Sequence, residues 1–305
     1  MNSDYKVSIV VICYNQEDYI EETLNSLINQ KTDFNFQLIV SDDSSTDSTL
    51  DKCLKLKNKF PNKIKVLSNS NNIGMVKNAI SAWSACDTEF IAFCEGDDYW
   101  IDEEKLQKQV QFLQNNESYG MIFTDSNALE VRSGNIIEKY FSKKNKMKDG
   151  IISNELILQS FVPTLTVCYR TKYIKSFLDE INPIERSWKM LDTPLAIYVS
   201  YHSLAKYDPY SSAVYRIHQE SSSSFQDFDK KIDFLLSKIN MKIFFLKKFN
   251  AEEYMYVKVL SQSLLSFISI IYNHGFPKQS SKVKAFTFLI MESLKQVFKK
   301  VTRMQ

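Results

Sequence analysis

Four short apolar runs alternate with helix-like segments in the first part of the chain, and this alternation restricts the fold more than any other feature. Each run has the length of a strand and is rich in β-branched or aromatic residues. The runs are Val7–Cys13, Phe36–Val40, Ile64–Leu67 and Phe90–Phe93. Between them, apolar residues recur at helical spacing, as at Leu24, Leu27 and Ile28. This alternation is typical of βαβ units and predicts an α/β protein with a mostly parallel, doubly wound sheet.

The alternation loosens in the middle of the chain and then gives way to helix alone. Further elements are expected as strands at Met121–Thr124, Thr164–Tyr169 and Ala213–Ile217 and as a helix over residues 193–203. From about Asp227 the pattern is helical, with no strand signals. We predict a catalytic domain over residues 1–225, a joint at Ser221–Ser224, and an all-helical C-terminal region over residues 226–305.

The two predicted parts differ in charge, although the whole chain carries only +2. From Asp229 onward, fourteen Lys and Arg stand against five Asp and Glu, so this part carries +9 and the remainder −7. Lysines placed among apolar residues suit an anionic membrane surface. Packing on the catalytic domain, or pairing with a second copy as a homodimer, is the alternative. Nucleic acid is not expected as a partner, because the larger part is acidic and no recognition motif is present.

The five cysteines indicate a reducing compartment. They are odd in number, lack the spacing of metal ligands, and several fall within apolar runs, so we expect reduced thiols in the core. The N-terminus lacks the pattern of a signal peptide. The longest uncharged stretch, Val259–Tyr272, is too short and too rich in serine to predict a membrane span. We expect a cytoplasmic protein that can lie peripherally at the inner face of the cell membrane.

Three carboxylates, those of Glu95, Asp97 and Asp98, follow closely on the fourth apolar run. The carboxyl end of a strand is where open α/β sheets bind ligands. Like charges this close repel and raise one another's pKa unless a cation or hydrogen-bond donors intervene. Carboxylate oxygens suit Mg²⁺ or Mn²⁺, which complete their coordination with water and phosphates. The stretch therefore favours a metal site, with a solvated acidic turn as the alternative.

A second acidic pair, Asp42 and Asp43, follows the run that begins at Phe36. Because neighbouring strands share one edge of a sheet, both acidic clusters can line one crevice. No Gly-rich loop of the Walker or dinucleotide-binding type is present, so phosphates would be held through a metal. These features favour a metal–nucleotide site, and capping of the following helix is the alternative role for Asp42 and Asp43.

Four motifs in order make the chain resemble the inverting family 2 glycosyltransferases, which have the GT-A fold. They are Ser8–Asn15, Val40–Asp47, Asn71–Gly74 with Lys77 and Asn78, and Glu95–Trp100. The last of them resembles the family's metal-binding motif, usually written Asp-x-Asp. The resemblance runs through most of the first 225 positions. It implies nucleotide-sugar binding by residues 1–125 and acceptor binding by residues 126–225.

The resemblance also implies roles for individual residues. Tyr14 and Asp43 would contact the nucleotide base, and Asp97 and Asp98 would bind the Mn²⁺ or Mg²⁺ that bridges the donor diphosphate. Glu95 stands where many members carry aspartate, and its longer side chain would reach the ribose or a metal-bound water. The other implied donor contacts are Asn15, Asp42, Gly74, Lys77 and Gly96. For the lysine among them, a solvated helix face is the alternative.

Two later segments extend the resemblance. Trp188–Leu195 resembles the segment that carries the catalytic base, which would be Asp192, and an N-cap of the following helix is the alternative. Ala213–His218 resembles the closing segment near the diphosphate. There Arg216 would neutralise phosphate and His218 would bind the metal, because residues two apart on a strand face the same side. An ordinary surface position is the alternative for His218.

Together these implications predict a metal-dependent inverting glycosyltransferase. It would move a sugar from a nucleoside diphosphate donor, foremost a UDP-sugar, to a hydroxyl of a glycan or lipid-linked acceptor in cell-surface polysaccharide synthesis. Asp192 would accept the acceptor's proton while the oxygen attacks the anomeric carbon. The alternatives are a nucleotidyltransferase on the same type of sheet, which would release pyrophosphate, and a non-catalytic scaffold with this fold.

Overall fold

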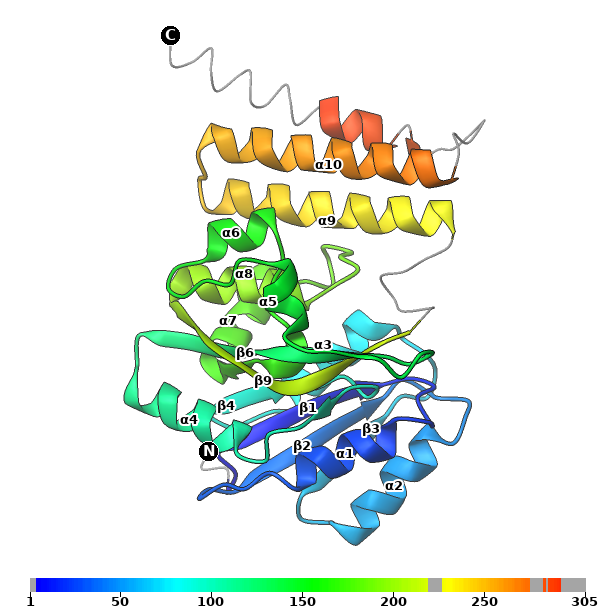
Figure 1. The fold of residues 1–305 in the computed structure, drawn as a ribbon, viewed down its shortest axis with the longest axis vertical. Helices are drawn as coiled ribbons and strands as arrows, with labels where there is room; N and C mark the ends of the chain where they lie inside the picture. Colours follow the sequence, from blue (N-terminus) through cyan, green and yellow to red (C-terminus); the bar gives the residue numbers. More distant parts are fainter. Residues whose placement is uncertain (1–3, 219–226, 275–281, 284, 292–305) are drawn as a thin grey trace. The chain divides into compact units, whose positions relative to one another are not determined.

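A computed structural model describes residues 4–218, 227–274, 282–283 and 285–291 of the chain, which form two compact units (Figure 1). The larger unit contains residues up to 153 together with 161–184 and 191–218. The smaller unit contains residues 154–160, 185–190 and the chain after 218. The predicted domain boundary near residue 225 and the joint at 221–224 lie outside the described residues.

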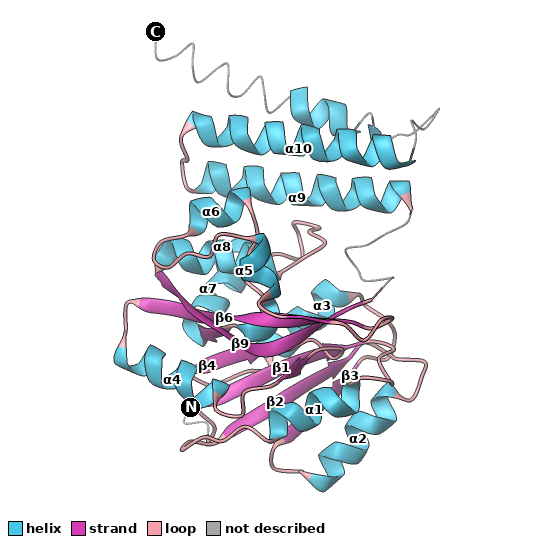
Figure 2. Ribbon diagram, viewed as in Figure 1, coloured by secondary structure: helices cyan, strands magenta, loops and turns pink. Residues whose placement is uncertain are grey.

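The first half of the larger unit is the alternating pattern that the sequence predicts. Its parallel strands are β1 (Val7–Cys13), β2 (Phe36–Asp42), β3 (Ile64–Ser68) and β4 (Phe90–Phe93). Its helices are α1 (Ile20–Ile28), α2 (Thr49–Lys59), α3 (Met75–Ser84) and α4 (Lys105–Asn115). Apolar residues of the four strands and of α1, α2 and α4 form one core, and the strands make a single layer with helices packed against it (Figure 2). The predicted α/β class is confirmed.

The second half of the sheet mixes directions. Its elements are β5 (Tyr99–Trp100), β6 (Tyr119–Glu130), β7 (Ile136–Ile137), β8 (Cys168–Arg170) and β9 (Leu204–Ile217). Strand β8 runs antiparallel to both β4 and β6, whereas β6 and β9 pair in parallel. The main order across the described sheet is β3-β2-β1-β4-β8-β6-β9-β5, and β7 pairs with β6. This order brings the ends of β4 and β9, far apart in sequence, to neighbouring positions around β5.

The strand expected over Thr164–Tyr169 is wrong in its first half. Residues Thr164–Thr166 form a 3₁₀ turn, in which the Thr166 N–H donates to the Pro163 carbonyl at 3.0 Å. The Thr166 hydroxyl lies 3.0 Å from the Thr124 carbonyl, so this threonine ties the turn to β6. The β-branched residues that predicted a strand therefore lie in a turn that leads into β8.

Strands β6 and β9 are longer than the sequence predicts because polar residues in β6 are buried there. Asp125 is fully buried, and its carboxylate accepts from the N–H groups of Ser126, Phe141 and Ser142 at 2.8–3.2 Å. The last two begin helix α5 (Tyr140–Lys144). A buried carboxylate is tolerated where donors surround it. The polar residues thus anchor a helix instead of ending the strand.

Lys105 at the start of α4 is fully buried in the core beside Trp100. Its Nζ donates to Gln109 Oε1 at 2.8 Å and lies 3.7 Å from the centre of the Trp100 ring. Burial lowers the pKa of this lysine to about 7. The described cysteines, Cys13, Cys53, Cys86, Cys94 and Cys168, are all free and buried, as predicted.

Replacing Lys105 with methionine is expected to change the pH dependence of stability. Between about pH 7 and the unfolded pKa of 10.5, the wild-type lysine binds fewer protons folded than unfolded, so wild-type stability rises with pH in this window. The variant lacks this rise. The melting temperature of the variant, compared with that of the wild type, should therefore decrease between about pH 6 and about pH 9. The decrease should be roughly 2–4 °C for each kcal/mol of folding stability that the wild type gains over this range. Thermal melts at both pH values check this, with the exposed Lys77→Met as control. A pH-independent difference would contradict the assignment.

Two further helices of the larger unit support the later strands, α7 (Thr171–Ile181) and α8 (Asp192–His202). Helix α6 (Ser153–Leu158) leads into the smaller unit. The smaller unit consists mainly of α9 (Phe228–Lys248) and α10 (Glu253–His274). The Asp227 side chain caps α9 by accepting from the Lys230 N–H at 2.8 Å. The predicted all-helical character holds for the described residues of this unit.

Helix α10 is long and apolar enough to cross a membrane by length and composition, over Glu253–Asn273. The sequence prediction of too short a stretch counted only Val259–Tyr272, whereas the helix begins six residues earlier. One third of its most apolar window is buried inside the protein. Ring stacking of Phe267 on Phe286, with centroids 3.9 Å apart, belongs to the core of this unit.

Candidate active site

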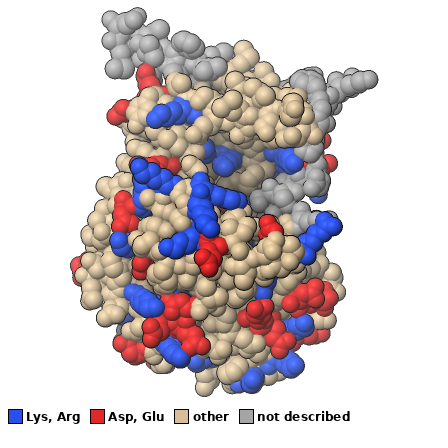
Figure 3. All heavy atoms as spheres, viewed as in Figure 1, with Lys and Arg blue, Asp and Glu red and all other residues tan. Residues whose placement is uncertain are grey.

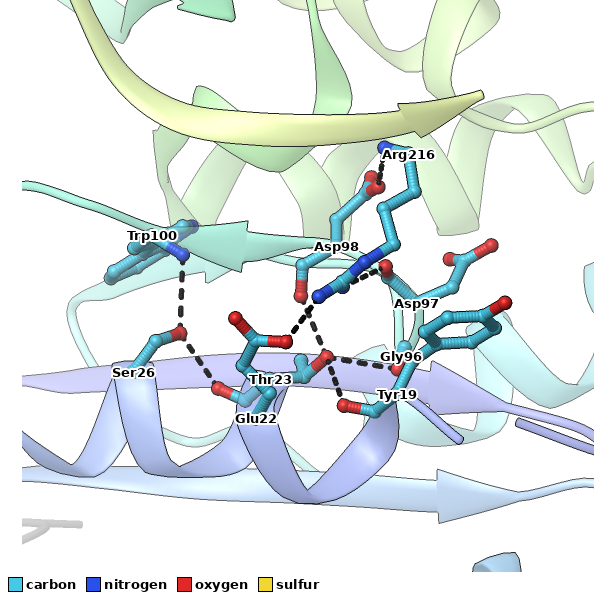
Figure 4. Close-up of polar contacts among 9 residues, drawn as sticks. All are labelled: Tyr19, Glu22, Thr23, Ser26, Gly96, Asp97, Asp98, Trp100 and Arg216. Atoms are coloured by element: carbon cyan, nitrogen blue, oxygen red, sulfur yellow. Dashed lines mark hydrogen bonds and ion pairs between the residues drawn. The ribbon is translucent and has the colours of Figure 1, made fainter. Parts of the chain in front are cut away.

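The loop after β4 is held tightly against the end of β1, and Gly96 makes this possible. The Gly96 N–H donates to the Ile12 carbonyl at 3.2 Å. A Cβ at Gly96 would lie 2.3 Å from Gln16 Oε1 and 2.8 Å from Cys13 Cβ, so any other residue would collide. On the other side, the Thr23 hydroxyl of α1 lies 2.9 Å from the Gly96 carbonyl (Figure 4). The role of Gly96 in this structure is therefore close backbone packing.

The two predicted metal ligands of this loop face different environments. Asp98 is 1% exposed, and its Oδ1 accepts from the Arg216 N–H of β9 at 2.8 Å (Figure 4). Burial, followed by the charges of Glu95 and Asp97, raises the pKa of Asp98 well above its usual range. The Asp97 side chain is 27% exposed, and its Oδ2 lies 3.3 Å from His218 Nε2. Asp98 therefore fastens the loop to β9 while Asp97 pairs with His218, and metal binding by both carboxylates stays a prediction.

Arg216 forms a clamp between β9, α1 and the loop after β4, and its phosphate contact stays a prediction. Its guanidinium pairs with the Glu22 carboxylate and donates to the Asp97 carbonyl (Figure 4). It lies between the rings of Tyr19 and Tyr99, 5.0 and 4.6 Å from their centres. The residue is 4% exposed. These contacts assign Arg216 a structural role, in which it holds the Asp97 backbone in place.

Replacing Arg216 with alanine is expected to cost about 2–3 kcal/mol of folding stability, because it removes a buried side chain packed between two rings. Glu22→Gln should cost about 1 kcal/mol or less, since the Glu22 side chain is 58% exposed and can be solvated without its partner. Chemical denaturation of both variants measures the difference. Equal and small losses would contradict the clamp.

His218 and Arg216 face the same side of the chain, as the sequence predicts, because both contact Tyr19. The imidazole of His218 lies 5.0 Å from the Tyr19 ring, centre to centre. Its Nε2 is buried and makes no aligned hydrogen bond within the part of the chain that the structure describes. Since this nitrogen points at the Asp97 carboxylate, it is available to a ligand that reaches both side chains.

Glu95 and Asp192 lie within electrostatic reach of each other. Burial, then the charge of Asp97, and finally that of Asp192, raise the pKa of Glu95 to about 8. The Glu95 Oε2 atom is buried and finds no hydrogen-bond partner among the described residues. The charge of Asp192 also contributes, after burial, to a raised pKa of Tyr169. The structure therefore brings Asp192, from α8, to the acidic loop after β4.

Asp192 is exposed in the first turn of α8 and does not cap that helix. Leu191 occupies the N-cap position, and the structure shows no side-chain capping bond there. The alternative interpretation of Asp192 as an N-cap is therefore wrong. An exposed carboxylate in the first turn is favoured by the helix dipole.

Asp43 holds the loop that precedes α3. Its Oδ1 accepts from Asn69 Nδ2 and from the Ile73 N–H, both at 2.9 Å, and its Oδ2 accepts from the Gly74 N–H at 2.8 Å. Gly74 has a φ of 85°, which favours glycine. A carboxylate has about four acceptor sites, so one on Asp43 remains for a ligand such as a base N–H.

The other predicted donor contacts are placed as follows. Asn15, with a φ of 51°, binds the second acidic loop through its Oδ1, which accepts from the Thr46 N–H at 2.8 Å. Asp42 is fully buried and accepts from the Ser45 N–H at 3.1 Å, so it shapes the turn. Tyr14 is 45% exposed, and Lys77 is exposed on α3. Of these residues, Tyr14, Asn15 and Lys77 are exposed and Asp42 is buried.

The residues that support the site were not predicted from the sequence. Tyr19 and Glu22 on or near α1 hold Arg216, and Asn69 and Asn78 hold each other and the second acidic loop. In the sequence, Glu22 has the pattern of an ordinary acidic residue on the surface of a helix. The asparagines were visible only as parts of a loop and of the third motif, so no signal distinguished them as buried.

The donor atoms present fit a divalent metal that also binds phosphate. Among the described residues, no group of three or more His, Cys, Asp and Glu is arranged as a complete metal site. Asp97 Oδ2 and His218 Nε2 nevertheless lie 3.3 Å apart. Glu95 Oε2, on the same loop as Asp97, is buried and has no hydrogen-bond partner among the described residues. Mg²⁺ and Mn²⁺ often take one or two protein ligands and fill the rest with water and substrate phosphates. The site therefore fits an ion that is completed by its substrate.

Comparison with known proteins gives a family match for the first part of the chain. Residues 8–158 match the family model described as glycosyl transferase family 2. An uncharacterised protein of Mycobacterium bovis is 34% identical over 164 residues, which is 54% of this chain and 46% of that protein. The poly(ribitol-phosphate) β-N-acetylglucosaminyltransferase TarS of Staphylococcus aureus is 33% identical over 56% of this chain and 28% of its own length. The chain thus spans about half or less of the length of these relatives.

Solved structures confirm the predicted GT-A fold. TarS residues 1–349 in complex with UDP-GlcNAc superpose with a TM-score of 0.63 at 20% identity, over 96% of this chain and 81% of that one. A mannosyltransferase of Pyrobaculum calidifontis in complex with GDP-Man and Mn²⁺ gives a TM-score of 0.59 at 14% identity, over 98% and 84%.

Proposed function

Because the chain carries a glycosyl transferase family 2 domain with the GT-A fold, we propose that it transfers a sugar, with inversion, from a nucleoside diphosphate donor to a hydroxyl acceptor. The observation that supports this most is the meeting of Asp97, His218 and Asp192 around one loop, although they come from three distant segments. Such a set supplies both a charged ligand for a diphosphate–metal group and a separate carboxylate base.

The donor would bind along the edge formed by the ends of β1, β2 and β4. Asp43 keeps one acceptor site for a base N–H, and the exposed ring of Tyr14 offers a face for stacking. A structural neighbour binds UDP-GlcNAc and another binds GDP-Man with Mn²⁺, which supports a nucleotide-sugar donor and a divalent ion. Asp97 and His218 would hold that ion. When bound, it would stabilise negative charge on the departing diphosphate.

Asp192 would act as the general base for the acceptor. Its exposed carboxylate would accept the hydroxyl proton as the acceptor oxygen bonds to the anomeric carbon and the bond to the diphosphate oxygen breaks. Attack opposite the leaving group inverts the anomeric centre. Arg216, Gly96 and Asp98 would keep the loop rigid during this step, because they tie it to β9 and α1.

The relatives indicate a setting for the reaction. The name of TarS describes transfer to poly(ribitol-phosphate), and a related Bacillus subtilis protein is named for teichuronic acid biosynthesis. We therefore propose an acceptor in cell-surface polysaccharide synthesis.

A donor screen with product identification tests the proposal. Purified protein is incubated with UDP-, GDP- and dTDP-sugars, with and without Mn²⁺, and the released nucleotide is measured. We expect a nucleoside diphosphate, with one donor preferred and with dependence on the ion. Release of pyrophosphate would instead identify a nucleotidyltransferase, and the absence of donor binding by calorimetry would identify a scaffold.

A further inference from the structure

The helical unit contains a cavity of about 520 Å³ that sugar transfer does not use. It lies between α9, α10 and the end of α6, all within one compact unit. Three lysines of α9 and several apolar side chains line it. The principal lining residues are Lys231, Lys238, Lys242, Phe234, Leu265 and Ile270.

The charged side chains that line the cavity are all lysines. No Asp or Glu is among the residues that line the cavity in the described structure. Lys242 is 6% exposed, and its Nζ donates to the Leu158 carbonyl at 2.9 Å. Burial, followed by the charge of Lys238, lowers the pKa of Lys242 to about 8. An anion in the cavity would relieve this repulsion.

An apolar stripe on α10 adjoins the cavity. Most of its members are three, four or seven residues apart, so they lie along one side of the helix. They are Tyr254, Val257, Leu264, Leu265, Ile268 and Tyr272. The most exposed are Tyr272 at 88% and Leu265 at 68%. Because Leu265 also lines the cavity, stripe and cavity are continuous. Uncharged side chains cover much of the helical unit in the face shown in Figure 3.

We propose that this surface docks on an anionic phospholipid membrane, with a phosphate headgroup in the lysine-lined cavity and the α10 stripe in the acyl-chain boundary. A basic cavity beside an apolar stripe matches the two chemical parts of such a lipid. Tyrosines at both ends of the stripe suit the interface, where an aromatic ring can be buried while its hydroxyl stays hydrated.

The charge of the surface favours a membrane over a second copy of the chain. In a two-fold dimer the same patch faces itself, so lysine-lined cavities would approach each other. Insertion of α10 across the bilayer is disfavoured as well. It would remove Val259, Leu260 and Phe267 from the core of the unit, where each is less than 10% exposed.

Vesicle flotation of the full chain tests the proposal. We expect the protein to float with vesicles of phosphatidylcholine and phosphatidylglycerol, to bind pure phosphatidylcholine at least tenfold more weakly, and to be released by high salt. The double variant Lys231→Gln, Lys238→Gln should lose about tenfold or more in binding. Leu265→Ser with Ile268→Ser should lose binding at low salt too. Lys55→Gln with Lys65→Gln, two exposed lysines of the catalytic unit, is the matched charge control.

Each contrary result overturns the docking mode. Equal binding to neutral and anionic vesicles, or full binding by the double lysine variant, would show that the lysine-lined cavity does not bind a phosphate headgroup. Resistance to carbonate extraction would show a spanning helix. A dimer by ultracentrifugation that Leu265→Ser with Ile268→Ser converts to monomer, without a change in flotation, would make the stripe a self-association surface. Circular dichroism and melting curves verify that each variant is folded.

Discussion

Turnover is expected to fall by about 10²–10⁴-fold when Asp192 is replaced with asparagine, the range typical of a lost general base. Asparagine keeps the size of the side chain but cannot accept the acceptor's proton. Binding of the nucleotide should stay within about threefold of wild type, because Asp192 lies on α8, outside the strand ends that would hold the nucleotide. Steady-state kinetics and calorimetry with UDP measure the two effects separately.

The control for this variant is Asp51→Asn. Asp51 is also an exposed aspartate in the first turn of a helix, α2, so both substitutions alter the same interaction with a helix N-terminus. Only the Asp192 variant should lose turnover. Near-normal turnover of Asp192→Asn, or an equal loss in both variants, would reject Asp192 as the base.

Asp97→Asn is expected to weaken Mn²⁺-dependent binding of UDP on the order of a hundredfold, whereas Asp98→Asn should retain most of it. The two carboxylates are adjacent in sequence but differ in what they contact. Asp97 faces His218 and is partly exposed, while Asp98 is buried against the Arg216 N–H. An asparagine at position 98 can still accept that hydrogen bond through its Oδ1.

Titration of each variant with UDP, with and without Mn²⁺, gives the comparison. His218→Ala should resemble Asp97→Asn, because both remove an atom of the same pair. Loss of ion-dependent binding in Asp98→Asn, with normal binding in Asp97→Asn, would show that Asp98 alone of the two ligands predicted from the sequence holds the ion. Melting curves separate either result from unfolding.

The alternation of apolar runs and helices was sufficient to predict the first half of the sheet. Strand β1 has the predicted bounds, and β2 and β3 extend the predicted runs by one or two residues. Strands β1 and β2 are buried on both faces, so their sequences are mostly apolar and easy to recognise, whereas β3 has only Ile64 fully buried. Strand β6 was only partly predicted, because Asp125 follows its apolar run and seemed to end it. The burial of Asp125 depends on N–H donors of α5 that are distant in sequence.

The site could be predicted in outline but not in the direction of each side chain. The motif after β4 and the spacing of Arg216 and His218 pointed to segments that the structure brings together, and both of these residues contact Tyr19. The loop geometry that turns Asp98 inward and Asp97 outward depends on Gly96 packing against β1 and on the Thr23 hydroxyl. Such long-range contacts leave no local pattern. For the same reason the Glu22–Arg216 pair was missed.

A crystal structure of the full chain with UDP and Mn²⁺ tests the central claim most directly. We expect the ion to be bound by the Asp97 carboxylate and the His218 imidazole, beside the diphosphate. Asp98 should still accept from the Arg216 N–H, and Asp192 should face the acceptor side. An ion held by Asp98, or a diphosphate bound away from the loop after β4, would contradict it.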